Sequence, residues 1–206
     1  MGQVYDFDHV TSYSIDYGNG KFEHVTFVNS ANQAYSMRFL KYPVKPGVLT
    51  VGIRDHMRGE THYFEAIENG GDQIHDFHFR YAKTIVFKNA DYYRRSRNYS
   101  HEIEFGSDSL TIKLRLYKKR SRKNPDITAN LTLSRFDRNL FPAVKYTMMD
   151  GMLSRLHLDY PFNAVLESGD YVTNGNHFRY KKVFVKPITL RIIAPAAKRY
   201  VNHINQ

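Results

Sequence analysis

The feature that most constrains the fold of this chain is an alternation of side-chain character with a period of two. In the first segment one face carries mainly apolar and aromatic residues and the other carries acids and serines. The two sets are Tyr5, Phe7, His9, Thr11, Tyr13, Ile15 and Tyr17 against Asp6, Asp8, Ser12, Ser14 and Asp16. Successive side chains of a β-strand point to opposite faces, so this pattern indicates one buried and one solvated face. Antiparallel sheets expose one face in this way, whereas parallel sheets are buried on both.

The same alternation returns later in the chain. Leu110, Ile112, Leu114 and Leu116 alternate with Thr111, Lys113 and Arg115. Ile127, Ala129, Leu131 and Leu133 alternate with Thr128, Asn130, Thr132 and Ser134. Turns rich in Gly and Asn separate such segments, because these residues tolerate positive φ. The predicted strands are Val4–Asp16, Phe22–Val28, Ala34–Tyr42, Val48–Ile53, Thr61–Ile67, Gln73–Tyr81 with Lys83–Lys88, His101–Phe105, Leu110–Tyr117, Ile127–Ser134, Asn163–Val172, His177–Val185 and Pro187–Ile193.

These strands predict a single all-β, mainly antiparallel domain over residues 1–206. A long meander must close or curl to protect its edges, which favours a curved meander sheet, a barrel or a half-barrel of about 11–12 strands. A two-sheet sandwich is the second alternative. One internal helix is expected near residues 138–153, where apolar residues repeat at helical spacing. Residues 194–206 are expected to form a short helix or a disordered tail.

Composition excludes several classes of site and partner. The chain has no Cys, which excludes disulfides, thiolate nucleophiles and cysteine metal sites. No apolar run approaches the ~20 residues of a membrane helix, so no transmembrane segment is predicted. The 30 Lys and Arg against 20 Asp and Glu give a net charge of +10. This excess is compatible with an anionic lipid surface or another polyanion, and nucleic acid is the less favoured member of that class.

Two basic segments are the candidate anion-binding site. Tyr92–Tyr99 interleaves cations with aromatic rings, and Lys118–Lys123 is a charged loop between two strands. Stacking on Tyr combined with phosphate contacts is how proteins hold single-stranded nucleic acid. The alternative is that both segments are solvated loops. The candidate residues are Tyr92, Arg94, Arg95, Arg97, Lys118, Lys119, Arg120, Arg122 and Lys123.

The predicted helix carries the candidate site for an apolar ligand. Its apolar face is rich in Met, whose flexible side chain adapts to irregular ligands. The helix could close the mouth of a curved sheet over a ligand, or it could fill the interior as core. The candidate ligand-binding residues are Leu140, Phe141, Met148, Met149 and Met152.

No catalytic motif stands out, so the sequence predicts a non-enzymatic protein without a cofactor. The chain contains no nucleophile elbow, P-loop or dinucleotide fingerprint. His75 and His78 lie near Asp72 and Asp76, but three residues apart on a strand they point to opposite faces. Glu102 and Glu104 share a face, as a glycosidase pair could, but a solvated strand face has the same pattern.

Three short motifs resemble those of exported all-β proteins of unknown function from the Bacteroidetes, including relatives of the GLPGLI family. They are Phe27-Val28-Asn29-Ser30-x-Asn32-x-x-Tyr35, Asn139-Leu140-Phe141-Pro142 and Phe178-x-Tyr180-Lys181-Lys182-x-Phe184. The resemblance implies a periplasmic, outer-membrane-associated or secreted protein, with a mature N-terminus near Gln3 after signal removal. The general layout is also similar to lipoprotein carriers, although those have several lid helices and an early helix.

The sequence therefore predicts a non-enzymatic cell-envelope protein that binds a hydrophobic ligand or a protein partner. A polyanion- or nucleic-acid-binding module that uses the basic loops is one alternative. A structural subunit of an envelope assembly, whose exposed edge strands are capped by a partner, is another.

Overall fold

The computed structural model describes residues 2–18, 20–40, 46–68, 77–86, 100–117, 123–143, 162–173 and 175–195. Its regular elements are strands and one short 3-10 helix. They are β1 (Gln3–Asp16), β2 (Lys21–Val28), β3 (Tyr35–Phe39), β4 (Thr50–Asp55), β5 (Glu60–Glu68), β6 (Phe77–Val86), β7 (Ser100–Phe105), β8 (Thr111–Tyr117), β9 (Ile127–Arg135), η2 (Phe141–Ala143), β10 (Ala164–Thr173) and β11 (Asn176–Ala194). No helix in these ranges is long and apolar enough to cross a membrane.

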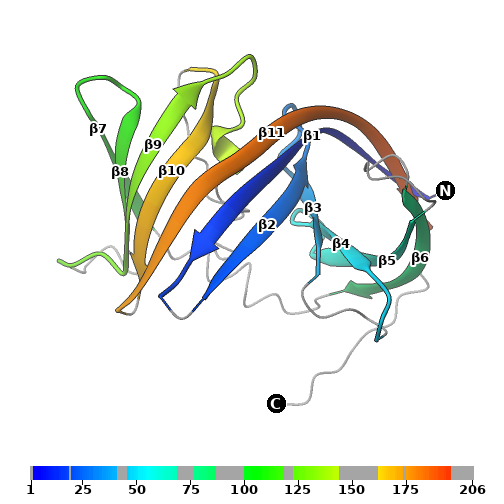
Figure 1. The fold of residues 1–206 in the computed structure, drawn as a ribbon. Helices are drawn as coiled ribbons and strands as arrows, with labels where there is room; N and C mark the ends of the chain where they lie inside the picture. The colour runs from blue at the N-terminus through cyan, green and yellow to red at the C-terminus, as the bar shows by residue number, and fades with distance from the viewer. Residues whose placement is uncertain are drawn as a thin grey trace. The chain divides into compact units, whose positions relative to one another are not determined.

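The strands form one 11-stranded sheet in the order β6-β5-β4-β3-β2-β1-β11-β10-β9-β8-β7 (Figure 1). The neighbours from β2 to β6 and from β7 to β11 pair antiparallel. The predicted all-β antiparallel class is thereby confirmed. The order is open, with β6 and β7 as its end strands, so a meander sheet fits and the predicted alternative of a closed barrel does not.

Residue contacts divide the chain into two compact units. The first unit is Met1–Val10, Val25–Ala90 and Lys186–Gln206, and the second is Thr11–His24 and Asp91–Val185. The long strands β1 and β11 are therefore each divided between the two units. The single domain predicted over residues 1–206 stays a prediction.

The first unit has a core of aromatic rings in edge-to-face contact. Phe7 packs against Tyr35 and Phe27, with ring centroids 5.5 Å and 6.4 Å apart, and Phe27 packs against Phe39 at 5.9 Å. This geometry places the positive edge of one ring on the negative face of the next. Met37, Val51 and Ile53 of the same unit are fully buried as well.

The second unit has an aliphatic core on one face of β8, β9 and β10. Its buried members are Tyr13, Ile15, Ile112, Leu114, Leu116, Ile127, Ala129, Leu131, Leu133, Phe141, Ala164, Leu166, Tyr171 and Tyr180. Most of these residues occupy the apolar phase of the alternation that the sequence shows. The opposite phase of the same strands is therefore the solvated face.

The first part of the segment predicted as a helix is not an α-helix. Its first residues are not helical, and Phe141–Ala143 form a single 3-10 turn. The backbone N–H of Leu140 donates to the Ala164 carbonyl at 2.8 Å, and the N–H of Phe136 donates to Asn163 at 3.1 Å. These bonds join the segment to the residues at the start of β10, and it is not helical before Phe141. Residues 144–153 of the predicted helix lie outside the described residues.

One predicted strand break does not occur, and one strand continues past its expected bend as predicted. Residues 176–194 form one strand, although a break was expected before Pro187. The pairing of β11 with β10 ends at Lys181, so Pro187 lies where its missing N–H deprives no β10 residue of a bond. Likewise β6 is continuous from Phe77 to Val86, with a register irregularity opposite Tyr63 and Phe64 where a bend was expected. Of the predicted C-terminal tail, Ala194 ends β11 and residues 196–206 lie outside the described residues.

Candidate functional site

The first candidate site is a buried polar cluster in the first unit, built on the turn between β4 and β5. Asp55 ends β4, and its Oδ1 accepts hydrogen bonds from the backbone N–H groups of Met57 at 3.0 Å and Arg58 at 2.9 Å. Gly59 closes the turn with φ of 69°, a left-handed conformation that favours glycine. Asp55 thus fixes the turn with one carboxylate oxygen and leaves the other for side chains.

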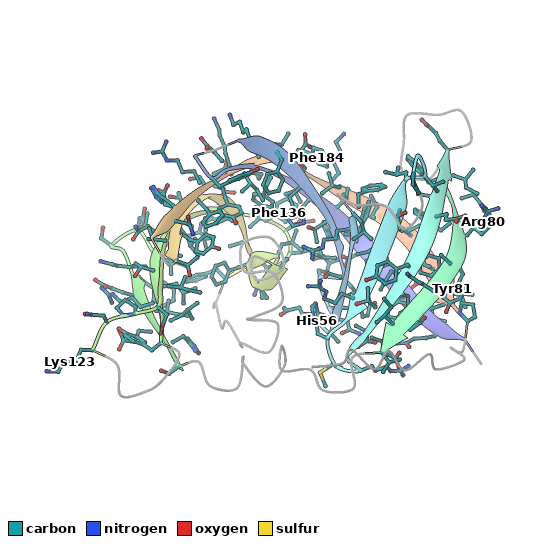
Figure 2. All side chains as sticks on the ribbon, turned by 90° about the horizontal axis from the view of Figure 1, so that it is seen from below. His56, Arg80, Tyr81, Lys123, Phe136 and Phe184 are labelled. Atoms are coloured by element: carbon teal, nitrogen blue, oxygen red, sulfur yellow. The ribbon has the colours of Figure 1, made fainter. Side chains whose placement is uncertain are left out.

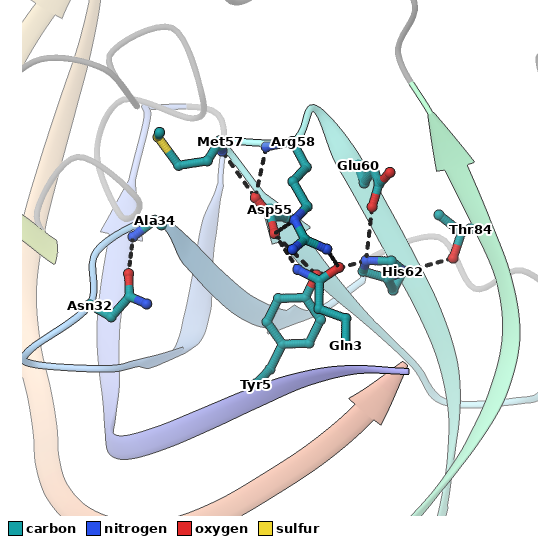
Figure 3. A network of polar contacts seen from close by, with 10 residues as sticks. All are labelled: Gln3, Tyr5, Asn32, Ala34, Asp55, Met57, Arg58, Glu60, His62 and Thr84. Carbon is teal, nitrogen blue, oxygen red and sulfur yellow. Dashed lines mark hydrogen bonds and ion pairs between the residues drawn. The ribbon is translucent and has the colours of Figure 1, made fainter. Parts of the chain in front are cut away.

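The second oxygen of Asp55 holds the beginning of β1 (Figure 3). Its Oδ2 accepts from Gln3 Nε2 at 2.6 Å and from the Tyr5 hydroxyl at 3.2 Å. The Arg58 guanidinium donates to Gln3 Oε1 at 2.5 Å. Only 6% of the Asp55 side chain is exposed, so the carboxylate is buried but surrounded by donors.

A chain of hydrogen bonds continues from Tyr5 into β5 and β6. His62 Nε2 lies 2.8 Å from the Tyr5 hydroxyl, and His62 Nδ1 lies 2.6 Å from the Thr84 hydroxyl. The Tyr81 hydroxyl lies 2.9 Å from Thr84 Oγ1. Because the Tyr5 hydroxyl donates to the Asp55 carboxylate, His62 Nε2 carries the proton and donates to Tyr5. Nδ1 then accepts from Thr84.

Burial sets the protonation of this cluster. Desolvation, with the negative charge of Asp55 second, raises the pKa of Tyr5 above its usual range. Desolvation lowers the pKa of His62, against the opposing effect of the Asp55 charge. Both groups are therefore neutral near pH 7. Each is only 1% exposed, and the cluster ties β1 to β4, β5 and β6.

The second candidate site is on the solvated face of the second unit. The cross-strand registers place polar side chains of β7 to β11 side by side in two rows. We name these two rows the polar trough: Glu104, Lys113, Asn130, Asp170 and Arg179 in one row, and Thr111, Thr132, Ser168 and Lys181 in the other.

Two open grooves follow the polar trough. The first, of about 270 Å³, is lined by residues of both rows from Glu104 to Asp170. The second, of about 380 Å³, is lined by Glu167 to Asp170 together with Arg179 to Lys181. They share Ser168, Gly169 and Asp170, so they adjoin on β10. The second unit thus carries a continuous hollowed strip across its strands.

Several side chains of the trough are held in place by ion pairs and hydrogen bonds. Arg115 donates to Glu104 at 2.9 Å, and the Thr111 hydroxyl donates to Asp108 at 2.9 Å. Arg179 lies 3.9 Å from Asp170. Gly106 leaves the space that Thr111 fills, since a Cβ there would lie 1.9 Å from its Oγ1.

Glu167 forms the irregular position of β10, where the register with β9 shifts between Leu166 and Ser168. The Lys182 ammonium pairs with it and the Ser134 hydroxyl donates to it at 3.0 Å. The hydrogen bond from Lys182, above all, lowers the pKa of Glu167. This carboxylate is accordingly ionised at the end of the second groove.

The predicted ligand-binding residues are only partly described. Leu140 and Phe141 are buried, 3% and 1% exposed, and Phe141 belongs to the core of the second unit. Neither lines one of the two grooves. Met148, Met149 and Met152 lie outside the described residues. A role of these residues in binding an apolar ligand stays a prediction.

The predicted anion-binding residues fall almost entirely outside the described part of the chain. Lys123 is exposed in the loop between β8 and β9 (Figure 2). The remaining eight, Tyr92, Arg94, Arg95, Arg97, Lys118, Lys119, Arg120 and Arg122, lie outside the described residues.

The weaker metal and catalytic alternatives find no support in the described residues. His78 is exposed on β6, and His75 lies outside the described residues. No group of three metal-ligating side chains occurs within the described ranges. Glu102 accepts from the Tyr117 hydroxyl at 2.8 Å, and Arg115 contacts both Glu102 and Glu104. The two carboxylates are thus part of an ion-pair network on the solvated face.

Sequence reasoning missed both sites, although a signal existed for each. The trough residues of β8 and β9 are the polar phase of the clearest alternation in the chain. The cluster of the first unit appears as polar residues in a buried phase, such as Asp55 after Val51 and Ile53, and His62 before Phe64.

No protein-family model and no curated protein matches this chain. The resemblance to exported Bacteroidetes proteins therefore stays a prediction from three short motifs.

Proposed function

We propose that this protein is a non-enzymatic binding protein of the cell envelope that recognises a polar partner through the polar trough. The observation that carries the proposal is the pair of adjoining grooves on the solvated face of the second unit. The grooves lie where the sequence places the short side chains of Thr111, Thr132 and Ser168 between longer charged ones.

Binding without catalysis agrees with the chemistry of the two sites. Tyr5 and His62, whose pKa values burial shifts, are each only 1% exposed, so a ligand in solution does not contact them. Glu104 and Asp170 of the trough lie instead on an open face, with Arg115 and Arg179 as their cationic neighbours. Such carboxylates can accept hydrogen bonds from a bound partner.

The alternatives from the sequence receive less support. Of the five residues predicted to bind a hydrophobic ligand, Leu140 and Phe141 are buried, and Met148, Met149 and Met152 lie outside the described residues. A subunit that offers its sheet edges to a partner would need long, flat, apolar end strands. Here β7 is six residues long and carries Glu102 and Glu104, while β6 carries Arg80 and Lys83 beside an irregular register. Arg80 of β6, labelled in Figure 2, forms an ion pair with Glu65.

The proposal is tested with amide and methyl NMR spectra of the full chain. Extracts of the source cells, separated into protein, glycan and small-molecule fractions, are added to the wild type and to two variants. Thr132→Trp fills the trough, and Thr128→Trp adds the same bulk on the same face of β9 outside both grooves.

We expect one fraction to shift the signals of Thr111, Asn130 and Ser168 in the wild type and in Thr128→Trp, but not in Thr132→Trp. If no fraction moves these signals, or if Thr132→Trp responds like the wild type, the trough is not the binding surface.

A further inference from the structure

We infer that the ligand of the polar trough is an uncharged oligosaccharide. This inference rests on the proposed function and names the class of molecule that the same surface recognises. It follows from three properties of the trough: its charge balance, its hydrogen-bonding groups and the direction in which it crosses the strands.

The trough is electrically balanced in a strongly basic protein. The side chains that line the two grooves include three carboxylates and three cations, namely Glu104, Glu167 and Asp170 against Lys113, Arg179 and Lys181. The chain as a whole carries +10, so the excess positive charge lies elsewhere. A polyanion would meet carboxylates along the whole strip, and such like-charge contacts oppose binding. An uncharged ligand meets no such penalty.

The groups of the trough match hydroxyl groups. Asn130 offers an amide, and Thr111, Thr132 and Ser168 offer hydroxyls, all of which combine donor and acceptor atoms. Carboxylates beside them only accept, and the Lys and Arg side chains only donate. A sugar hydroxyl both donates and accepts, so it can bridge an acceptor and a donor from neighbouring strands. An apolar ligand would form no hydrogen bond with these groups and would displace the water that solvates them.

The geometry separates a sugar from a peptide. An extended peptide brings a regular series of backbone N–H and C=O groups, which pair best with the open edge of a sheet. The trough instead crosses the face of the sheet from β7 to β11, where neighbouring strands already pair their backbone groups with one another. Strands lie about 4.8 Å apart, so five strands give a strip of roughly 19 Å.

The trough also has a fixed shape. Arg115 holds Glu104, and Asp108 holds Thr111, before any ligand arrives. Pre-organised side chains lose less entropy on binding, which matters for a weakly held, hydrated ligand.

The experiment uses calorimetric titration of the full chain with cellohexaose, chitohexaose and maltohexaose. A heparin hexasaccharide serves as the polyanionic probe. The variants are Thr132→Trp, Asn130→Ala, which removes an amide without adding bulk, and the control Thr128→Trp. Far-UV circular dichroism verifies that each variant is folded.

We expect at least one neutral hexasaccharide to bind the wild type with Kd below about 1 mM, and Thr132→Trp to weaken binding at least about 10-fold. Asn130→Ala should weaken it several-fold, and Thr128→Trp should change it less than about 2-fold. Affinity should be nearly independent of salt between about 50 and about 300 mM, unlike binding of a polyanion.

The inference is overturned if none of the neutral sugars binds, if Thr132→Trp and Asn130→Ala bind as the wild type does, or if only heparin binds and does so with steep salt dependence. If no sugar binds but a protein fraction shifts the NMR signals of the trough, the inference of a sugar ligand is overturned and the proposed function is not. Failure of every fraction to move the trough signals would overturn the proposed function as well.

Discussion

Removing the Tyr5 hydroxyl tests whether the buried polar cluster stabilises the first unit. Tyr5→Phe keeps the ring, whose centroid lies 5.0 Å from that of Tyr35, and deletes two hydrogen bonds. Asp55 keeps Gln3 and two backbone donors. His62 loses the acceptor of its Nε2 proton, and Glu60 Oε2 lies 3.6 Å away, beyond hydrogen-bond distance.

The expected loss follows from those partners. The 3.2 Å bond to Asp55 is long for a hydroxyl donor, so most of the effect comes from the unpaired, buried His62 N–H. An unsatisfied buried polar group costs about 1–3 kcal/mol, and the lost bond to a carboxylate adds to it. We therefore expect Tyr5→Phe to lower the free energy of unfolding by about 2–4 kcal/mol.

The measurement is urea unfolding followed by far-UV circular dichroism, since the chain has no Trp to report by fluorescence. With a slope of about 2–3 kcal/mol per molar urea, the midpoint should fall by roughly 1 M. Hydrogen exchange of β1 and β5 then locates the loss in the first unit. The control is Tyr63→Phe on β5, whose ring faces Lys83 and whose hydroxyl bonds to no described residue.

The control should lose less than about 0.5 kcal/mol. Equal stability of Tyr5→Phe and Tyr63→Phe would show that the cluster is neutral to stability, and the reasoning would fail. A large loss confined to exchange in β7–β10 would refute it as well, because Tyr5 belongs to the first unit.

Three further predictions address pH, packing and the apolar-ligand site. Because burial lowers the pKa of His62, its contribution to stability should be complete above about pH 6.5 and decline as pH falls below it. The urea midpoint of the wild type should therefore drop more than that of His62→Gln between about pH 7.5 and about pH 5.5. Parallel pH profiles of the two proteins would contradict this prediction. Gly106→Ala should destabilise by about 1–3 kcal/mol in urea unfolding, since the methyl collides with Thr111, and Thr111→Ala should relieve the loss. Phe141→Ala should cost about 3–5 kcal/mol by the same measurement; a loss below about 1 kcal/mol would indicate that Phe141 lines a ligand pocket instead of core.

The strand content was predictable because its signal is local. Ile112, Leu114 and Leu116 alternate with polar residues, and the structure places these three side chains in the core. The observed β8 begins one residue after the predicted strand. The continuity of β11 was not predictable, because the tolerance of Pro187 depends on where β10 stops pairing with it. That is a property of a neighbour distant in the sequence. The prediction for the start of the helix was wrong for the same reason. The backbone hydrogen bond from Leu140 to Ala164 joins residues distant in the sequence, and the local helical spacing of apolar residues does not reveal it.

The two candidate sites differ in how much of them a sequence can reveal. In the first unit, Asp55 and His62 occupy buried positions of their strands, and a polar residue there requires partners that periodicity cannot name. Those partners, Tyr5 and Thr84, come from strands β1 and β6, 57 and 22 residues from His62. In the second unit the trough residues of β8 and β9 obey the alternation. Ser168 and Asp170 share the parity of the buried Ala164 and Leu166, and they reach the solvated face because the register shifts at Glu167. What distinguishes the trough is the register, which aligns Thr111, Thr132 and Ser168 into a row of short side chains. A one-residue slip of β9 would turn Thr132 into the core and remove the groove together with the fold. The same hydrogen bonds that hold the sheet therefore create the binding surface, and a variant such as Thr132→Trp can change that surface while leaving the register intact.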